Sequence, residues 1–194
     1  VESLKAEDWA MIWEQVMGPG LKSGSEAQWD EGQLREQRWV DLATAKEDSI
    51  GFRKRGVYWI TGGVSGIGWL TAQRLASVYH ARLLLTGRRP INPEIRQRLE
   101  ELQHAGGDAI YVSCDVERPV AMKRVVQIAR QRWGGLNGVL HSAGIIEDSF
   151  LISKDPDSFH RALGPKTRGT KILDEVTSHE NLDLFILFAS LSGV

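Results

Sequence analysis

Cysteine is nearly absent from the sequence, because Cys114 is the only one among 194 residues. A chain with one thiol forms no internal disulfide, which fits a reducing cytoplasm. Long apolar runs are also absent, since even residues 184–189 (LFILFA) fall far short of the roughly 20 residues that a membrane-spanning helix needs. Neither sign of charge dominates, because the formal net charge is -1. We therefore expect a cytoplasmic protein with neither a nucleic acid nor a membrane as its partner.

What the sequence does contain is the balance of a soluble globular domain, with 42% hydrophobic and 25% charged residues. The length suits one domain with an appendage. Apolar residues recur at helical spacing near the start of the chain: Leu4, Trp9, Ile12, Trp13 and Val16. A polar stretch over 21–33 and a short strand at Trp39–Val40 are expected to follow. We expect residues 1–50 to form a small appendage, which either docks on the main domain or binds a separate partner.

Residues 51–194 alternate between predicted strands and predicted helices. The strands are expected at 57–61, 81–86, 109–113, 138–141 and 182–188, and the helices at 69–79, after Asn92 and Pro93, over 122–133 and over about 156–177. These strands are apolar on both faces, which is typical of a parallel sheet that helices cover on both sides. We therefore predict an α/β fold with a Rossmann-like doubly wound parallel sheet. We expect it to be incomplete at its C-terminal side, because no helix follows the last strand.

A glycine turn joins the first strand to its helix. After the apolar residues 57–60 come Thr61, Gly62, Gly63, Val64, Ser65, Gly66, Ile67 and Gly68. Strand, glycine turn and helix in this order predict a site for the diphosphate of a dinucleotide. Gly62 allows the turn without a Cβ clash, Gly66 allows the backbone to approach the diphosphate, and Gly68 allows close packing of helix and strand. The helix N-terminus adds unpaired N–H groups and a positive dipole end. A purely structural glycine turn is the alternative.

The end of the second strand predicts which cofactor the site takes. A site for NAD usually has Asp or Glu at this place, where the carboxylate binds the ribose 2′-hydroxyl. This sequence has Gly87, Arg88 and Arg89 instead. A guanidinium forms paired charge-assisted bonds with a 2′-phosphate, which a carboxylate would repel. Arg88, helped by Arg89, therefore predicts NADPH, unless both arginines are ordinary solvated side chains of a loop.

Two further strand ends complete the predicted cofactor site. Asp115 and Val116 follow the third strand. There Asp115 either accepts a hydrogen bond from the adenine amino group or caps the next helix. Ser142, Ala143 and Gly144 follow the fourth strand, and their small size lets the chain pass close to the cofactor.

His141 and Cys114 are candidates for chemistry that we interpret as structural. His141 has no second His, Cys or carboxylate at the spacing of a metal site, so a packed histidine is predicted and no metal. Cys114 is interpreted as a small buried residue.

Together these motifs resemble a known family. The residues concerned are Thr61 to Gly68, Gly87–Arg88–Arg89, Cys114–Asp115–Val116, His141 to Gly144, Pro165–Lys166 with Gly169, and Phe188–Ala189–Ser190 with Gly193–Val194. Over residues 56–194 the chain resembles the ketoreductase domain of a modular polyketide synthase, a relative of the short-chain dehydrogenases/reductases. The segments GVYWITGG, LLLTGRR and LFASLSGV are most similar to the bacterial type whose acyltransferases act in trans.

The resemblance implies an oxidoreductase that uses NADPH. In the family, hydride passes from NADPH to the β-carbonyl of an acyl chain on the phosphopantetheine arm of an acyl carrier protein. Ser190 matches the serine whose hydroxyl bonds the carbonyl oxygen. Lys166 matches the lysine that orders the cofactor ribose and lowers the pKa of the catalytic tyrosine. Donors aimed at a developing alkoxide, and a cation beside a phenol, suit this chemistry. The implied partners are the acyl carrier protein and neighbouring synthase domains, and residues 1–50 would be the tail of a structural subdomain or a linker.

The sequence also departs from the family pattern. Asp148 matches the last acid of a Leu-Asp-Asp signature, which implies a D-configured hydroxyl, but Ile146 and Glu147 differ from its first two letters. The family's catalytic tyrosine and asparagine would lie beyond Val194, the last residue. We therefore expect a fragment that holds the cofactor half of the site and an incomplete proton-delivery half.

The alternative function is a non-catalytic, truncated ketoreductase that serves as a structural scaffold in a megasynthase. The missing tyrosine favours the scaffold. Retention of Arg88, Lys166 and Ser190 favours the enzyme, because a scaffold needs none of them. A freestanding fatty-acid or alcohol reductase is disfavoured by the long segment before the glycine turn and by the position of Lys166 upstream of the tyrosine.

Overall fold

The computed structural model describes residues 12, 14, 27–30, 33–36, 51–145 and 155–189. The chain divides into two compact units, Val1–Glu47 and Asp48–Val194. Ile12 and Glu14 are helical. The strand predicted at Trp39–Val40 and the site residues Asp148 and Ser190 lie outside the described residues.

The first unit contains a β-hairpin that the sequence analysis did not predict. β1 (Ala27–Asp30) pairs in antiparallel fashion with β2 (Gln33–Glu36), and Trp29 lies opposite Leu34. The polar composition of residues 21–33 predicts no strand there. Each strand has only 4 residues and mixes polar with apolar side chains. Neither gives the sustained alternation that indicates a strand.

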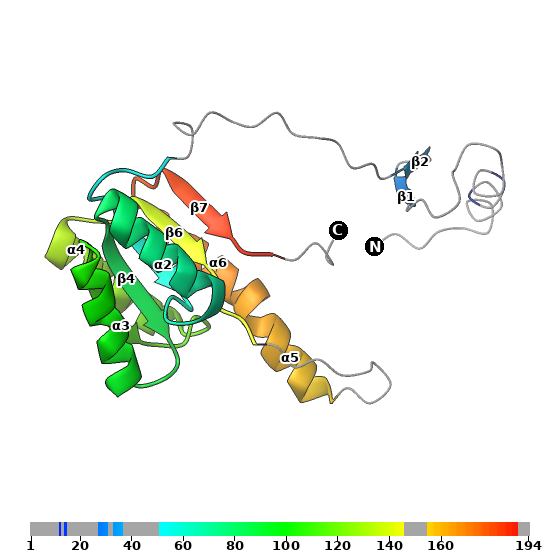
Figure 1. Ribbon diagram of the computed structural model, residues 1–194. Coiled ribbons are helices and arrows are strands. Elements are labelled where there is room, and N and C mark those ends of the chain that lie inside the picture. The colour runs from blue at the N-terminus through cyan, green and yellow to red at the C-terminus, as the bar shows by residue number, and fades with distance from the viewer. Residues whose placement is uncertain are drawn as a thin grey trace. The chain divides into compact units, whose positions relative to one another are not determined.

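The second unit is built on a five-stranded parallel sheet (Figure 1). Its strands are β3 (Val57–Thr61), β4 (Arg82–Gly87), β5 (Asp108–Ser113), β6 (Gly138–His141) and β7 (Leu184–Leu187). They lie in the order β5-β4-β3-β6-β7, and every neighbouring pair is parallel. The connecting helices are α2 (Gly66–Tyr79), α3 (Pro93–His104), α4 (Pro119–Trp133), α5 (Pro156–Gly164) and α6 (Thr170–Thr177). The prediction of a Rossmann-like α/β sheet is confirmed.

The strand order creates a switch point at the centre of the sheet. From β3 the chain moves outward through β4 to β5, and it then returns to β6 on the other side of β3. Thr61, the last residue of β3, therefore pairs with Thr86 on one side and with His141 on the other. In open parallel sheets, ligands bind beyond the carboxyl ends of the strands at such a point.

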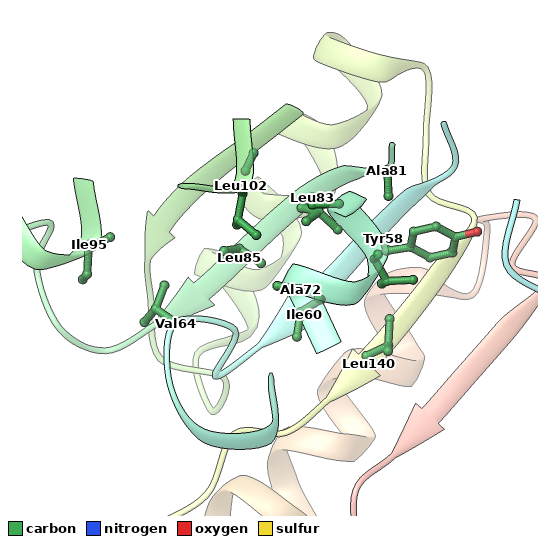
Figure 2. Packing of buried hydrophobic residues seen from close by; sticks show 13 residues of the cluster. Tyr58, Ile60, Val64, Ala72, Ala81, Leu83, Leu85, Ile95, Leu102 and Leu140 are labelled. Atoms are coloured by element: carbon green, nitrogen blue, oxygen red, sulfur yellow. The ribbon is translucent and has the colours of Figure 1, made fainter. Parts of the chain in front are cut away.

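Helices bury both faces of the sheet, as strands without polar alternation require. Successive residues of a strand point to opposite faces. Ile60 and Leu85 accordingly belong to a cluster packed under α2 and α3, which Figure 2 shows. Trp59 and Leu84 belong to a second cluster under α4 and α6. In Figure 1, α2 and α3 lie on the face of the sheet turned toward the viewer.

The long helix predicted over 156–177 is present but not uniform. A π-helix, Pro165–Gly169, separates α5 from α6. Pro165 has no N–H to donate to the preceding turn, and a proline inside a helix disturbs the regular pattern at that point. Among the helices in the described ranges, none is both long and apolar enough to cross a membrane.

Candidate nucleotide-binding site

A cleft of about 890 Å³ opens at the carboxyl ends of β3, β4, β5 and β6. It lies at the switch point of the sheet, the place where the fold predicts a ligand. Its lining comes from four strand ends and the π-helix: Thr61, Gly62, Val64, Ser65, Gly66, Ile67, Thr86, Gly87, Arg88, Arg89, Pro90, Tyr111, Cys114, Asp115, Val116, Ser142, Ala143, Gly144, Ile145, Pro165 and Lys166. Its volume lies within the usual range of small-molecule sites, about 300–1,000 Å³.

The three glycines of the turn meet different local constraints. Gly62 has a φ of +68°, and a Cβ there would come within 3.1 Å of the Ala143 backbone. Gly66 has a φ of +52°, and a Cβ there would meet no atom within 4 Å, so its backbone faces open space. At Gly68 a Cβ would lie 2.3 Å from the Ser142 hydroxyl oxygen and 2.7 Å from the Gly62 carbonyl oxygen. The turn is thus tight against β6 and open toward the cleft.

The N-terminus of α2 is available to an anion. Ser65 is the N-cap residue, and its side chain makes no capping hydrogen bond. The first N–H groups of a helix have no partners within the helix, and they carry the positive end of its dipole. Ser65, Gly66 and Ile67 all line the cleft. A diphosphate placed here would therefore meet free donors.

The two arginines after β4 differ in their partners. Arg89 forms an ion pair with Glu94, with 3.5 Å between Nη1 and Oε2. Arg88 is exposed, and within the described part of the chain its guanidinium forms no ion pair. Their backbone is fixed from β5, because Tyr111 donates to the Arg89 carbonyl at 2.6 Å and Ser113 donates to the Arg88 carbonyl at 3.3 Å. The hydrogen bonds from β5 fix the backbone of the loop, and the Arg88 guanidinium stays available to bind a ligand.

Asp115 does not cap α4. The N-cap residue of that helix is Arg118, and its side chain makes no capping bond. Asp115 instead accepts a hydrogen bond from the Glu117 N–H at 3.0 Å, in a turn that leads away from β5. This bond occupies one carboxylate oxygen, Oδ1. Asp115 also lines the cleft, and the Glu117 bond leaves its other oxygen, Oδ2, unused.

A chain of polar contacts ties the end of β3 to the end of β6. The Thr61 hydroxyl lies 2.6 Å from His141 Nδ1 and accepts from the Ala143 N–H at 3.2 Å. The Ser142 hydroxyl donates to the Thr61 carbonyl at 2.7 Å. His141 Nε2 lies 2.9 Å from the Pro165 carbonyl oxygen. Burial lowers the pKa of His141, the bond to Pro165 acts in the opposite direction, and the nearby Lys166 ammonium lowers the pKa further.

Lys166 projects from the π-helix to the cleft. Its Nζ donates to the Phe188 carbonyl at 3.0 Å, at the end of β7. A Cβ at Gly144 would lie 3.2 Å from Lys166 Cε, so the lysine stem passes close to the segment after β6. Partial burial lowers the pKa of the ammonium group. A cation is therefore held between the ends of β6 and β7, on the wall of the cleft.

Comparison with known proteins identifies the family. Residues 56–194 match the family model of the KR domain. The chain belongs to the KR domain family. It is 43% identical over 155 residues to the polyketide synthase PksM of Bacillus subtilis (strain 168), covering 80% of this chain and 4% of that protein. It is 37% identical over 175 residues to PksN of the same organism, covering 89% and 3%. The chain thus spans only a few per cent of these curated relatives.

Solved ketoreductase structures share the fold. An N-terminal ketoreductase from the macrolactin assembly line is 38% identical with a TM-score of 0.73, over 84% of this chain and 32% of that one. A ketoreductase domain from the bacillaene assembly line is 32% identical with a TM-score of 0.73, over 86% and 40%. The resemblance to polyketide synthase ketoreductases is confirmed. Membership of this family implies a nicotinamide cofactor.

In this ketoreductase domain the structure gathers nearly all of the predicted site residues that it describes. Of the predicted cofactor residues, only Gly63 and Gly68 do not line the cleft; Gly63 is buried against Ile60 and Leu85. Lys166 lies on the same wall. Ser190 and Asp148 lie outside the described residues, so their predicted roles stay predictions. His141 is packed and hydrogen-bonded on both ring nitrogens.

Sequence reasoning missed several lining residues of the ketoreductase cleft. Tyr111 was not predicted as a site residue, yet it lines the cleft and supports the Arg89 backbone. Thr86, Pro90, Ile145 and Pro165 also line it. Thr86, at the end of β4, could have been found from the rule that strand ends of parallel sheets carry ligand contacts. The position of Pro165 depends on packing that no local sequence pattern predicts.

Proposed function

We propose that this ketoreductase domain binds NADPH in the cleft and takes part in reducing the β-keto group of an acyl chain on an acyl carrier protein to a D-configured β-hydroxyl. The observation that carries the proposal is the placing of the Arg88 guanidinium, without an ion-pair partner among the described residues, on the cleft that also holds the glycine turn and the α2 N-terminus. A phosphate group at each of these places would find a donor.

The residues of the cleft fit the cofactor. The open space at Gly66 leaves room for a diphosphate beside the helix N-terminus. The strand-end residues of β4 carry no carboxylate, so nothing there opposes a 2′-phosphate. Asp115 lines the cleft and would accept from an amino group of the cofactor, and Ser142, Ala143 and Gly144 line it with little side-chain bulk. When bound, NADPH supplies the hydride for the reduction.

Lys166 and Ser190 are proposed to act on the reacting groups. Lys166 would hold the cofactor ribose and favour the ionised form of the catalytic tyrosine, because a cation lowers the pKa of a phenol beside it. Burial lowers the pKa of the Lys166 ammonium, and its bond to the Phe188 carbonyl directs it toward the end of β7. Ser190 follows that strand and would donate to the carbonyl oxygen as negative charge develops there.

A fluorescence titration of the chain with NADPH and NADH tests the cofactor proposal. We expect NADPH to bind more tightly, and Arg88→Ala to weaken NADPH binding about tenfold or more while leaving NADH nearly unchanged, because charge-assisted hydrogen bonds are worth about 1.5–3 kcal/mol. Arg89→Ala is the matched control. Its guanidinium already pairs with Glu94, so a smaller loss is expected. A folded chain that binds neither nucleotide would contradict the proposal and leave the non-catalytic scaffold as the function.

The D configuration and the carrier-bound substrate rest on the resemblance at Asp148 and on the family. The measurement is the reduction of a β-ketoacyl thioester with NADPH by the ketoreductase domain with its catalytic tyrosine present, followed by chiral analysis of the hydroxy product. An L-configured product would refute the assignment of Asp148.

A further inference from the structure

His141 bridges two elements that are distant in sequence and lie on opposite sides of its ring. The side chain is buried, with only 1% of its surface exposed. Its Nδ1 faces the Thr61 hydroxyl of β3 at 2.6 Å, and its Nε2 faces the Pro165 carbonyl of the π-helix at 2.9 Å. Both ring nitrogens are therefore engaged, as buried polar atoms require.

The partners determine where the proton of the ring lies. The Pro165 carbonyl can only accept a hydrogen bond, so Nε2 carries the hydrogen. In the neutral ring Nδ1 is then an acceptor, and the Thr61 hydroxyl donates to it. The Thr61 oxygen in turn accepts from the Ala143 N–H at 3.2 Å. Each group in this series of hydrogen bonds thus has a single consistent assignment as donor or acceptor. Together the bonds fix the orientation of the imidazole ring.

The Pro165 carbonyl belongs to the segment that carries Lys166. The segment is a π-helix, an uncommon form that frequently occurs at functional sites. Several contacts hold it. His141 bonds its first residue, and Gly169, its last residue, packs so closely on Val116 that a Cβ would lie 2.8 Å from Val116 Cγ1. The Thr170 hydroxyl also donates to the Lys166 carbonyl at 2.5 Å, and Arg168 forms an ion pair with Glu117 at 3.8 Å. The His141 bond holds the residue that directly precedes Lys166.

We propose that His141 is a positioning residue, whose Nε2–H holds the Pro165 carbonyl and thereby sets where the Lys166 ammonium lies in the cleft. The role rests on the proposed function, because it matters only if Lys166 meets the cofactor. It connects the end of β3, where the glycine turn begins, with the segment that carries Lys166. His141 itself is buried and does not line the cleft.

Two substitutions separate the two sides of the ring. His141→Asn places an amide near the position of Nδ1, so it can keep the contact with Thr61 and loses the donor to Pro165. His141→Gln reaches the position of Nε2 and keeps that donor. We expect His141→Asn to weaken NADPH binding about tenfold and to move the pKa of Lys166 back toward its ordinary value of 10.5, because the segment is released toward solvent. We expect His141→Gln to change the NADPH affinity by less than about twofold and to leave the pKa of Lys166 close to its wild-type value.

NMR of the reductively ¹³C-methylated chain gives the Lys166 titration, with Lys166→Met to assign the signal. Equal loss in the two variants, or an unchanged Lys166 pKa in His141→Asn, would overturn the positioning role. If His141→Asn does not fold, ¹⁵N NMR of the wild-type imidazole decides, because a hydrogen on Nδ1 instead of Nε2 refutes the bond to Pro165. A wild-type chain that binds no NADPH would refute the proposed function, whereas the Lys166 titration still reports on the positioning.

Discussion

Single residues of the cleft act mostly by leaving room or by holding their neighbours. Gly68 is the clearest example, because a methyl group there would overlap both the Ser142 hydroxyl and the Gly62 carbonyl. Gly66, two residues earlier, has space for a side chain but a backbone φ of +52°, which favours glycine. Substitution of Gly68 therefore tests steric crowding, and substitution of Gly66 tests backbone strain.

Gly68→Ala is expected to destabilise the domain by about 2 kcal/mol or more, since forcing atoms into a packed site typically costs about 1–3 kcal/mol and the nearest obstacle includes backbone. Gly66→Ala is the matched control and is expected to cost about 1–2 kcal/mol from the left-handed backbone alone. Urea unfolding of both variants gives the two free energies of unfolding. A Gly68→Ala variant as stable as wild type would show that the turn is looser than the structure indicates.

The titration of His141 predicts how stability depends on pH. Burial lowers its pKa in the folded state, and the Lys166 ammonium adds to the lowering, while the Pro165 carbonyl opposes it. Below the unfolded-state pKa of about 6.5, the unfolded chain therefore binds the proton first. The free energy of unfolding should fall as the pH drops from about 6.5 toward the folded-state pKa. Above about pH 6.5, His141 should contribute no further change in the free energy of unfolding. Chemical denaturation at several pH values measures the slope.

His141→Gln is the control for this pH dependence, because glutamine does not titrate. We expect a smaller loss of stability between about pH 7 and about pH 5 in that variant. An identical slope in both proteins would assign the dependence to other groups.

Residue by residue, the sequence predicted the lining of the cleft where a motif has a fixed backbone geometry. The glycine turn and Arg88 follow from such local rules. Tyr111 and Pro165 could not be predicted in the same way, because their places depend on strand register and on a helix distortion. The alternative that Asp115 caps a helix was wrong, since the N-cap residue of α4 is Arg118, further along the chain.

At the scale of elements, the helices begin in different ways. α3, α4 and α5 each have proline at the first helical position, where the missing N–H does no harm. Asn92 and Asp155 also cap their helices, by accepting from the N–H groups of Ile95 at 2.9 Å and Ser158 at 3.0 Å. The N-terminus of α2 has no such side-chain bond, which leaves it free for a ligand.

Asn92→Ala should lower the free energy of unfolding by about 1 kcal/mol, because it removes the capping bond of α3. Asn92→Asp keeps an acceptor at the same place and should be close to wild type. Thermal or urea unfolding of the two variants compares them directly. Since Asn92 and α3 do not line the cleft, NADPH affinity should be unchanged in both.

Elements were predictable where the apolar pattern was long. The strands of the sheet were found within about two residues of their observed ends, because each contains an apolar run between turn residues. The hairpin of β1 and β2 gave too short a pattern. The end of α2 also gave no glycine signal, because His80 adopts the left-handed conformation with a φ of +48°. The π-helix has no sequence signature beyond Pro165.

At the scale of the whole molecule, sheet, helices and cleft belong to one unit, Asp48–Val194. The walls of the cleft come from strand ends that are neighbours only in the folded sheet. A ligand that binds there therefore binds the folded chain and not the unfolded one. This links cofactor binding to the stability of the entire unit.

NADPH at about 100 times its dissociation constant should raise the free energy of unfolding by about 2.7 kcal/mol. NADH at the same concentration should give a smaller increase, as should NADPH with the Arg88→Ala variant. The midpoint of thermal unfolding, followed by circular dichroism, measures the effect. Equal stabilisation by both nucleotides would remove the preference that Arg88 is proposed to provide.

Cys114, which the sequence analysis interpreted as a buried residue, is only half-buried and lies on the wall of the cleft, with its sulfur 3.8 Å from the sulfur of Met122. Burial raises the pKa of its thiol to about 11. The reactive thiolate is therefore scarce at neutral pH, and alkylating reagents should act on it slowly. Because the sequence has no other cysteine, a thiol introduced on the surface could be labelled selectively without first removing the native one. A fluorophore or a spin label could therefore be attached at one chosen surface position by a single substitution to cysteine.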